Sequence, residues 1–92
     1  MMPNSLEPLH FAIIRSFRDG RARCADDVVA ALEADYAGYK MLTRKDVEEA
    51  LATAKENGIL DEVAFSVGSD GALVVSYRMT DFGRDMIDRY LG

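Results

Sequence analysis

The apolar residues in the first part of the chain recur at three- and four-residue steps, which is the spacing of one face of an α-helix. This pattern predicts two helices. The first begins at Asn4 or Ser5, whose side chains can accept a hydrogen bond from a first-turn amide, and ends at Gly20, which can adopt the left-handed conformation that closes a helix. The second covers residues 25–36 and contains no lysine or arginine. The predicted buried positions are Leu6, Leu9, Ile13 and Phe17 in the first helix and Val28, Leu32 and Tyr36 in the second.

A third helix, residues 43–57, has recognisable signals at both ends. Thr43 and Asp46 stand three residues apart and form an approximate capping box at its start. Asn57 and Gly58 are typical of a helix end. The apolar positions between these signals are Val47, Ala50, Leu51 and Ala54.

After Gly58 the pattern changes from helical to alternating. Alternating apolar positions on both sides of the turn sequence GSDG, residues 68–71, predict two antiparallel strands joined as a β-hairpin. Residues 80–91 return to a helical pattern, with Gly83 in the first turn. The alternating positions are Val63, Phe65, Val67, Leu73, Val75, Tyr77 and Met79. The order of elements is therefore α+β: three helices, a hairpin and a closing helix, with a bridge at residues 21–24 that can hold a short extended segment.

The composition is that of an ordinary globular protein. The chain has 92 residues, of which 49% are hydrophobic and 29% charged, which excludes a disordered or fibrous protein and fits one domain over residues 1–92. Cys24 is the only cysteine, so no intramolecular disulfide can form. No apolar run approaches the roughly 20 residues that span a bilayer, and the first residues lack the features of a secretory signal. We expect a cytoplasmic protein.

Two segments resemble winged helix-turn-helix regulators. Residues 43–60 are similar to the recognition helix of these proteins and the start of their wing, where a glycine and an apolar pair follow the helix as Gly58, Ile59 and Leu60 do here. Residues 77–87 resemble the end of the wing and the last helix of PadR-like and related regulators. The shared pattern is an aromatic, any residue, an aliphatic, a threonine, two variable residues and a glycine, and it is matched by Tyr77, Met79, Thr80 and Gly83. The resemblance implies a three-helix core, a two-stranded antiparallel wing and a C-terminal helix.

The resemblance also implies a transcriptional regulator that binds double-stranded DNA. In such proteins the third helix lies in the major groove and the wing reaches an adjacent groove or the backbone. Carried over to this chain, the candidate DNA contacts are Lys40, Thr43, Arg44, Lys45 and Lys55. Arg44 could grip a guanine edge with two hydrogen bonds. A further group of arginines (Arg15, Arg18, Arg21 and Arg23) can contact the DNA backbone or simply solvate the surface.

The charge of the chain argues against strong DNA binding. The net charge is −5, and residues 43–57 carry three basic and four acidic side chains. The wing loop has no basic residue and presents Asp70. Because duplex DNA is a dense line of negative charge, an acidic surface is repelled from it. Two hypotheses therefore stay open: a DNA-binding regulator, and a winged helix that serves as a protein–protein interaction module.

The last helix offers more apolar surface than a short end helix needs to close its own core. We expect it to form a homodimer interface through Phe82, Met86, Ile87, Tyr90 and Leu91. Leu6, Leu9, His10 and Phe11 of the first helix could complete the patch. The alternative is that these residues only close a small core.

The residue types needed for catalysis are nearly absent. His10 is the only histidine and falls on the apolar face of the first helix, which predicts a packed structural role. Cys24 has no histidine near it in sequence, and no cysteines and histidines have the spacing of zinc ligands. We expect no enzyme activity, no metal and no cofactor.

Overall fold

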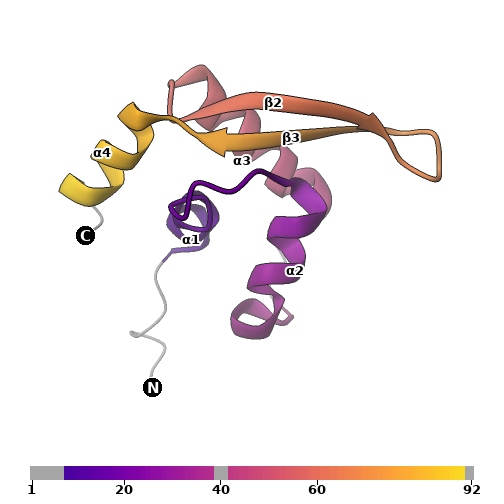
Figure 1. Cartoon of the computed structure of the whole chain (residues 1–92). Helices are drawn as coiled ribbons and strands as arrows, with labels where there is room; N and C mark the ends of the chain where they lie inside the picture. Colours follow the sequence, from indigo (N-terminus) through magenta and orange to yellow (C-terminus); the bar gives the residue numbers. More distant parts are fainter. Residues whose placement is uncertain (1–7, 39–41, 91–92) are drawn as a thin grey trace.

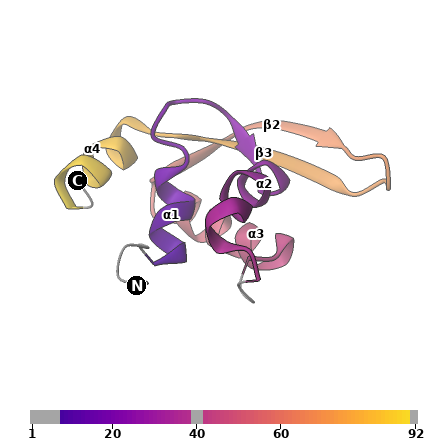
Figure 2. The ribbon, with the colours of Figure 1, turned by 90° about the horizontal axis from the view of Figure 1, so that it is seen from below.

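The computed structural model describes residues 8–38 and 42–90. It contains four helices and three strands in this order: α1 (Leu9–Arg15), β1 (Arg23–Cys24), α2 (Ala25–Tyr36), α3 (Arg44–Glu56), β2 (Leu60–Val67), β3 (Leu73–Met79) and α4 (Asp81–Tyr90). Figure 1 shows β2 and β3 as a long hairpin, with α1 and α2 below it, α3 passing behind it and α4 at the end opposite the hairpin loop. In the view from below, α1, α2 and α3 are grouped together, and the loop end of the hairpin extends beyond them (Figure 2).

The first helix is shorter than its apolar pattern predicts. It begins at Leu9, after Pro8, and the predicted start at Asn4 or Ser5 lies outside the described residues. It ends at Arg15, because the chain then tightens into turns with hydrogen bonds three residues apart. The Ser16 hydroxyl donates to the Ile13 carbonyl oxygen at 2.6 Å, which satisfies one of the last carbonyl groups of the helix.

The predicted ends of the third helix are confirmed, with Thr43 and Asn57 as its caps. The Thr43 side chain accepts a hydrogen bond from the Asp46 amide at 3.1 Å. At the other end Gly58 adopts a φ of +80°, and the Ile59 amide donates to the Ala54 carbonyl at 2.9 Å. This is the Schellman arrangement, which only a residue tolerant of the left-handed region forms without strain. It turns the chain directly into β2.

The sheet has three strands, in the order β1-β3-β2, where the sequence predicted two. The bridge segment forms β1, which pairs antiparallel with β3 through Arg23 opposite Tyr77 and Cys24 opposite Ser76. A strand of two residues is too short to show a periodic pattern, so only its position beside β3 reveals it. The α+β fold class and the wing are otherwise as predicted.

A β-bulge between Glu62 and Ala64 shifts the register of β2 against β3. Before the bulge Leu60 lies opposite Met79, and after it Phe65 lies opposite Val75. Residues an odd number of positions apart in a regular strand face opposite sides of a sheet. The bulge therefore turns Phe65 to the side of the sheet that Leu60 faces, which is the side of the helices.

The core lies between α1, α2, α3 and the near half of the hairpin. Its largest fully buried side chains are Phe17, Val28, Val47, Leu51 and Leu60. The predicted positions Leu9, Ile13, Tyr36 and Ala54 are also buried, and Leu32 is half-buried. Within the described residues, no helix has the length and apolar character needed to cross a membrane.

Thr80 and Gly83 attach α4 to the start of the wing. The Thr80 hydroxyl donates to the Gly58 carbonyl oxygen at 2.6 Å and accepts from the Gly83 amide at 2.9 Å. The Thr80 amide donates to the Ile59 carbonyl at 2.9 Å. A Cβ at position 83 would overlap the Ile59 carbonyl oxygen and lie 2.9 Å from its Cγ2. The threonine and the glycine of the sequence pattern are therefore both explained by one close contact.

Candidate nucleic-acid interface

Helix α3 has three faces with different roles. Val47, Leu51 and Ala54 bury its inner face. Helical spacing places a second set of exposed residues opposite that face; this outer face comprises Lys45, Glu49, Ala52 and Glu56. The third face is turned towards α2 and the wing and carries Arg44, Glu48 and Lys55, as their ion pairs below show.

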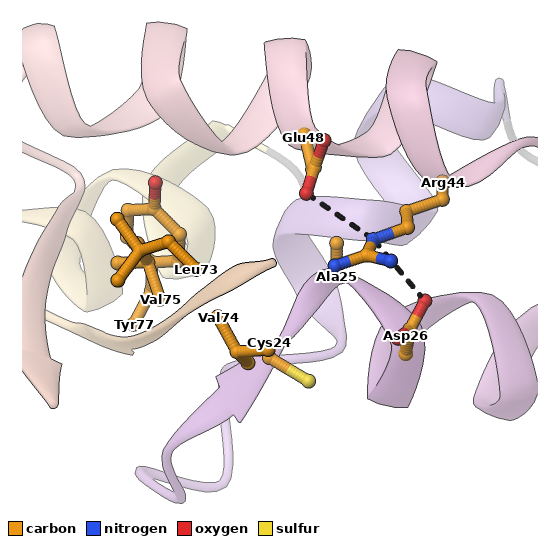
Figure 3. A pocket seen from close by; sticks show the side chains of 9 residues that line it. All are labelled: Cys24, Ala25, Asp26, Arg44, Glu48, Leu73, Val74, Val75 and Tyr77. Atoms are coloured by element: carbon orange, nitrogen blue, oxygen red, sulfur yellow. Dashed lines mark hydrogen bonds and ion pairs between the residues drawn. The ribbon is translucent and has the colours of Figure 1, made fainter. Parts of the chain in front are cut away.

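Arg44, the strongest candidate for reading a base, is engaged within the protein. Its Nε lies 3.3 Å from a Glu48 oxygen and 3.7 Å from a carboxylate oxygen of Asp26 on α2. Figure 3 shows the guanidinium held between these two carboxylates. The spacing of Arg44 and Glu48 on one helix could have predicted the first contact. The second depends on how α2 and α3 cross, and sequence reasoning missed it.

The other predicted DNA contacts have separate positions. Lys55 pairs with Glu62 of β2 at 3.5 Å and so ties the end of α3 to the wing. Thr43 is occupied as the cap of the helix. Lys45 is exposed and makes no ion pair with any residue that the structure describes. Lys40 lies outside the described residues.

The outer face of α3 carries more negative than positive charge. Lys45 stands at the N-terminal end, while Glu49 and Glu56 follow one and three turns later. Amides at the start of a helix and the helix dipole attract anions, whereas carboxylates repel phosphate. Attraction to DNA on this face is therefore confined to the first turn.

The wing loop is closed by its own backbone and by an acidic side chain. The Gly68 amide donates to the Ala72 carbonyl at 2.8 Å, and the Ala72 amide donates to the Asp70 carboxylate at 3.0 Å. Gly71 has a φ of +83°, which the turn requires. The loop thus places a carboxylate where a DNA-binding wing would need a cation.

Large apolar side chains of the wing lie exposed beside this loop. Phe65 is 61% exposed, Val67 72% and Leu73 60%. Val67 lies opposite Leu73, and Phe65 lies opposite Val75, so all of them share the side of the hairpin that faces the helices. We call Phe65, Val67 and Leu73 the wing stripe.

A pocket of about 150 Å³ continues from the wing stripe towards the N-terminal ends of α2 and α3. In Figure 3, Leu73, Val75 and Tyr77 are grouped on one side of β3, with Glu48 and Arg44 on the neighbouring helix. Burial raises the pKa of the Tyr77 phenol, and the negative charges of Glu62 and Glu48 raise it further. The full lining is Cys24, Ala25, Asp26, Arg44, Glu48, Leu73, Val74, Val75 and Tyr77.

Two of the arginines after α1 form ion pairs with aspartates of the chain. Arg18 pairs with Asp88 of α4 at 2.8 Å. Arg23 grips both carboxylate oxygens of Asp19, at 2.8 and 2.7 Å. This hydrogen bonding, with a further bond from the Arg21 amide, holds the pKa of the Asp19 carboxyl well below its ordinary value, and it raises the pKa of Arg23.

The predicted dimer residues fall into two groups. Met86, Ile87 and Tyr90 line an apolar groove of about 440 Å³ between α1 and α4, together with His10, Phe11, Ile14, Ile59 and Gly83. Ile87 is buried in the core, whereas Tyr90 is 71% exposed. Phe82 is exposed but lies apart from the groove, near Gly58, and Leu91 lies outside the described residues.

The prediction that His10 is packed is wrong. Its side chain is exposed at the edge of the groove, where its ring lies 6.1 Å from that of Phe11. The reason is how α1 is placed on the core: its buried positions are Leu9, Ala12, Ile13 and Ile14, and His10 falls beside this stripe.

Comparison with known proteins identifies the fold of this chain. No protein-family model matches the chain, and no curated protein matches it by sequence. The structure is similar, with a TM-score of 0.66 and 13% sequence identity, to that of a PadR-like transcriptional regulator from Bacillus cereus strain ATCC 14579. The match covers 90% of this chain and 77% of that one. The chain has the winged helix-turn-helix fold of PadR-like regulators, as the segments around Gly58 and Thr80 predicted.

Proposed function

We propose that this protein is a transcriptional regulator that binds double-stranded DNA through the N-terminal end of α3. The observation that carries the proposal is the position of Lys45 in the winged-helix fold. It is an exposed lysine in the first turn of the third helix, with no ion pair among the described residues. Helix-turn-helix proteins present this end of the helix to the major groove, where base edges and phosphates are within reach. Such a regulator would act in the cytoplasm.

Arg44 is available to DNA at small cost. Its contacts with Asp26 and Glu48 are surface ion pairs, with 38% of the Arg44 side chain exposed. Exposed ion pairs contribute about 0–1 kcal/mol, so a phosphate or a guanine edge can replace the carboxylates. Thr43 caps the N-terminal end of α3. The remaining candidate contacts are Lys40, which precedes Thr43 by three residues in the sequence, and Lys55 in the last turn of α3.

Affinity on so acidic a chain requires two copies. In the proposed homodimer the α1–α4 grooves of two subunits face each other, with Met86 and Tyr90 at the contact. A two-fold pair is the usual symmetry of small regulators and doubles the number of phosphate contacts. Light scattering at two concentrations tests this part separately, and a strict monomer would contradict it.

A salt titration of binding to mixed duplex DNA tests the proposal. Three or four phosphate contacts predict a slope of about −3 to −4 in a plot of log affinity against log salt for one bound subunit, and about twice that slope for a dimer that binds with both subunits. Lys45→Ala should lower the steepness by about one for each bound subunit, because it removes one phosphate contact from each. Arg89→Ala is the matched control, since it removes one positive charge from α4. Absence of binding at low salt across random duplexes would rule the proposal out.

A second candidate, a protein–protein interaction module, is favoured by the outer face of α3. Glu49 and Glu56 outnumber Lys45 there, and the wing loop adds Asp70. The same titration separates the two candidates, because a module of this kind shows no measurable binding to duplex DNA at any salt concentration.

A further inference from the structure

The wing stripe is mostly exposed, so it contributes little to the core of this chain. Phe65, Val67 and Leu73 are each at least 60% exposed. In Figure 1 the half of the hairpin next to its loop projects past the helices. Full burial of a large apolar side chain stabilises a fold by roughly 1.5–3 kcal/mol. Because these three side chains stay mostly exposed, each contributes only a small part of that free energy. An exposed contiguous set of this kind marks a surface that another molecule covers.

The two sides of the wing differ sharply in chemistry. The side away from the helices carries Ala64, Ser66 and Ser76, with Val74 as a bulky apolar residue opposite Ser66. Phe65, Val67, Leu73 and Val75 are gathered on the side of the helices, and the bulge before Ala64 brings Phe65 and Val67 there. The apolar surface on this side continues into the pocket, whose lining includes Leu73 and Val75. A side chain of a bound molecule could therefore enter the pocket.

Carboxylates border this apolar surface. Asp26 and Glu48 stand at the pocket, Glu62 faces Tyr77, and Asp70 occupies the loop. Two cations, Arg44 and Lys55, are the counterions of the first three, which leaves the border negative. Phosphate is therefore repelled from the wing stripe, whereas a lysine or arginine is attracted to it.

We propose that the wing stripe and the adjoining pocket form a docking site for an amphipathic segment of a partner protein that carries apolar side chains and at least one lysine or arginine. The apolar side chains pack on Phe65 and Leu73, and one of them enters the pocket as an anchor. The basic side chain pairs with Asp26 or Glu48, beside or in place of Arg44. The site is separate from the outer face of α3 and does not depend on DNA binding.

Short synthetic peptides test this site on the full chain. The probe is an amphipathic peptide of leucine and lysine, and two control peptides replace the lysines by glutamate or the leucines by serine. Binding is measured by chemical-shift changes in the isotope-labelled protein. We expect the leucine–lysine peptide to change the chemical shifts of residues 63–67, 73–77 and 24–26. We expect each control peptide to bind at least about tenfold more weakly.

Substitutions assign the binding to the wing stripe. Phe65→Ser combined with Leu73→Ser should weaken the leucine–lysine peptide by about tenfold or more, since both contacts are lost. Phe82→Ser is the matched control, because Phe82 is an exposed apolar residue away from the wing and its removal should leave affinity unchanged. Val67→Ser provides a second variant if the double variant fails to fold, with a smaller loss expected.

Three results would overturn the proposal. One is peptide binding that the wing substitutions leave unchanged, which would show attraction to the acidic surface in general. Another is a concentration-dependent dimer that Phe65→Ser dissociates, which would make a second copy of this chain the occupant. The last is a DNA duplex that shifts residues 63–67 while the leucine–lysine peptide does not.

Discussion

Helix α3 and the wing, the two elements that act together in a DNA-binding winged helix, differ in their surface chemistry in this protein. Helix α3 keeps a cationic first turn, although Arg44 and Lys55 are both paired with carboxylates. The wing has no cation near its loop and presents the apolar wing stripe instead. In the two proposals made above, DNA would therefore bind one small patch on α3, and a protein partner would bind the apolar surface of the hairpin.

A second contrast runs along the single strand β2. Its first residue, Leu60, is fully buried, whereas Phe65 five residues later is 61% exposed on the same side of the sheet. The hydrophobic core of this chain accounts for the apolar residue Leu60, but it does not account for the apolar residue Phe65. The predictions below test these two contrasts, beginning with the largest expected effect.

Leu60→Ala and Phe65→Ala should separate the two ends of β2 by stability. Loss of a fully buried leucine creates a cavity and costs about 2–5 kcal/mol of unfolding free energy. Phe65 is 61% exposed and lies opposite Val75, and its removal should cost under about 1 kcal/mol. Urea denaturation of both variants measures the difference. Equal losses would mean that the far half of the wing belongs to the core.

Gly83→Ala should destabilise the attachment of α4 to the wing. The added Cβ overlaps the Ile59 carbonyl, and such overpacking costs about 1–3 kcal/mol even though alanine favours a helix. Asp85→Ala, on an exposed position of the same helix, is the control and should stay within about 0.5 kcal/mol. Thermal unfolding measures both. A stabilised Gly83→Ala variant would show that α4 does not lie against Ile59.

Glu49→Lys combined with Glu56→Lys should increase affinity for duplex DNA if α3 enters the groove. The two substitutions turn the outer face basic and raise the net charge from −5 to −1, since each adds two charges. We expect about tenfold tighter binding and a salt slope steeper by about one to two. Glu33→Lys combined with Asp35→Lys on α2 gives the same net charge. Equal gains from both pairs would show that DNA responds to total charge and does not touch α3.

Ionisation of Tyr77 reports the charges that face the pocket. Burial and the carboxylates of Glu62 and Glu48 raise its pKa above the ordinary value of 10.0. Its contribution to stability is therefore present below pH 10 and is lost as the pH rises through the folded-state pKa. Glu48→Gln should lower the pKa of Tyr77 towards the ordinary value, and Glu49→Gln on the outer face should not. A pH titration of the ring signals measures the pKa of Tyr77. If Glu49→Gln lowered this pKa and Glu48→Gln did not, Glu48 would not face Tyr77 as the structure has it.

Local signals explain why most elements were predicted. Thr43 and Asp46 lie in one turn, Gly58 acts on its own backbone, and the loop at residues 68–71 contains its whole turn chemistry. Each of these interactions spans only a few residues, so the chain order alone reveals it. Resemblance of the segments around Gly58 and Thr80 to known regulators supplied the winged-helix arrangement.

Contacts between distant elements explain what was missed. The partner of Arg44 on α2, the pairing of β1 with β3, the exposure of His10 and the close approach of Gly83 to Ile59 each require two segments to be placed in space. The bulge in β2 is a further example, because an extra residue in one strand can be recognised only from its pairing with the neighbouring strand. The sequence by itself determined the order of the elements and the acidic balance of the chain, since these follow from composition and short-range pattern. The tertiary structure alone decided which charges of α3 are paired and which side of the wing is apolar, because both depend on how helices and strands cross.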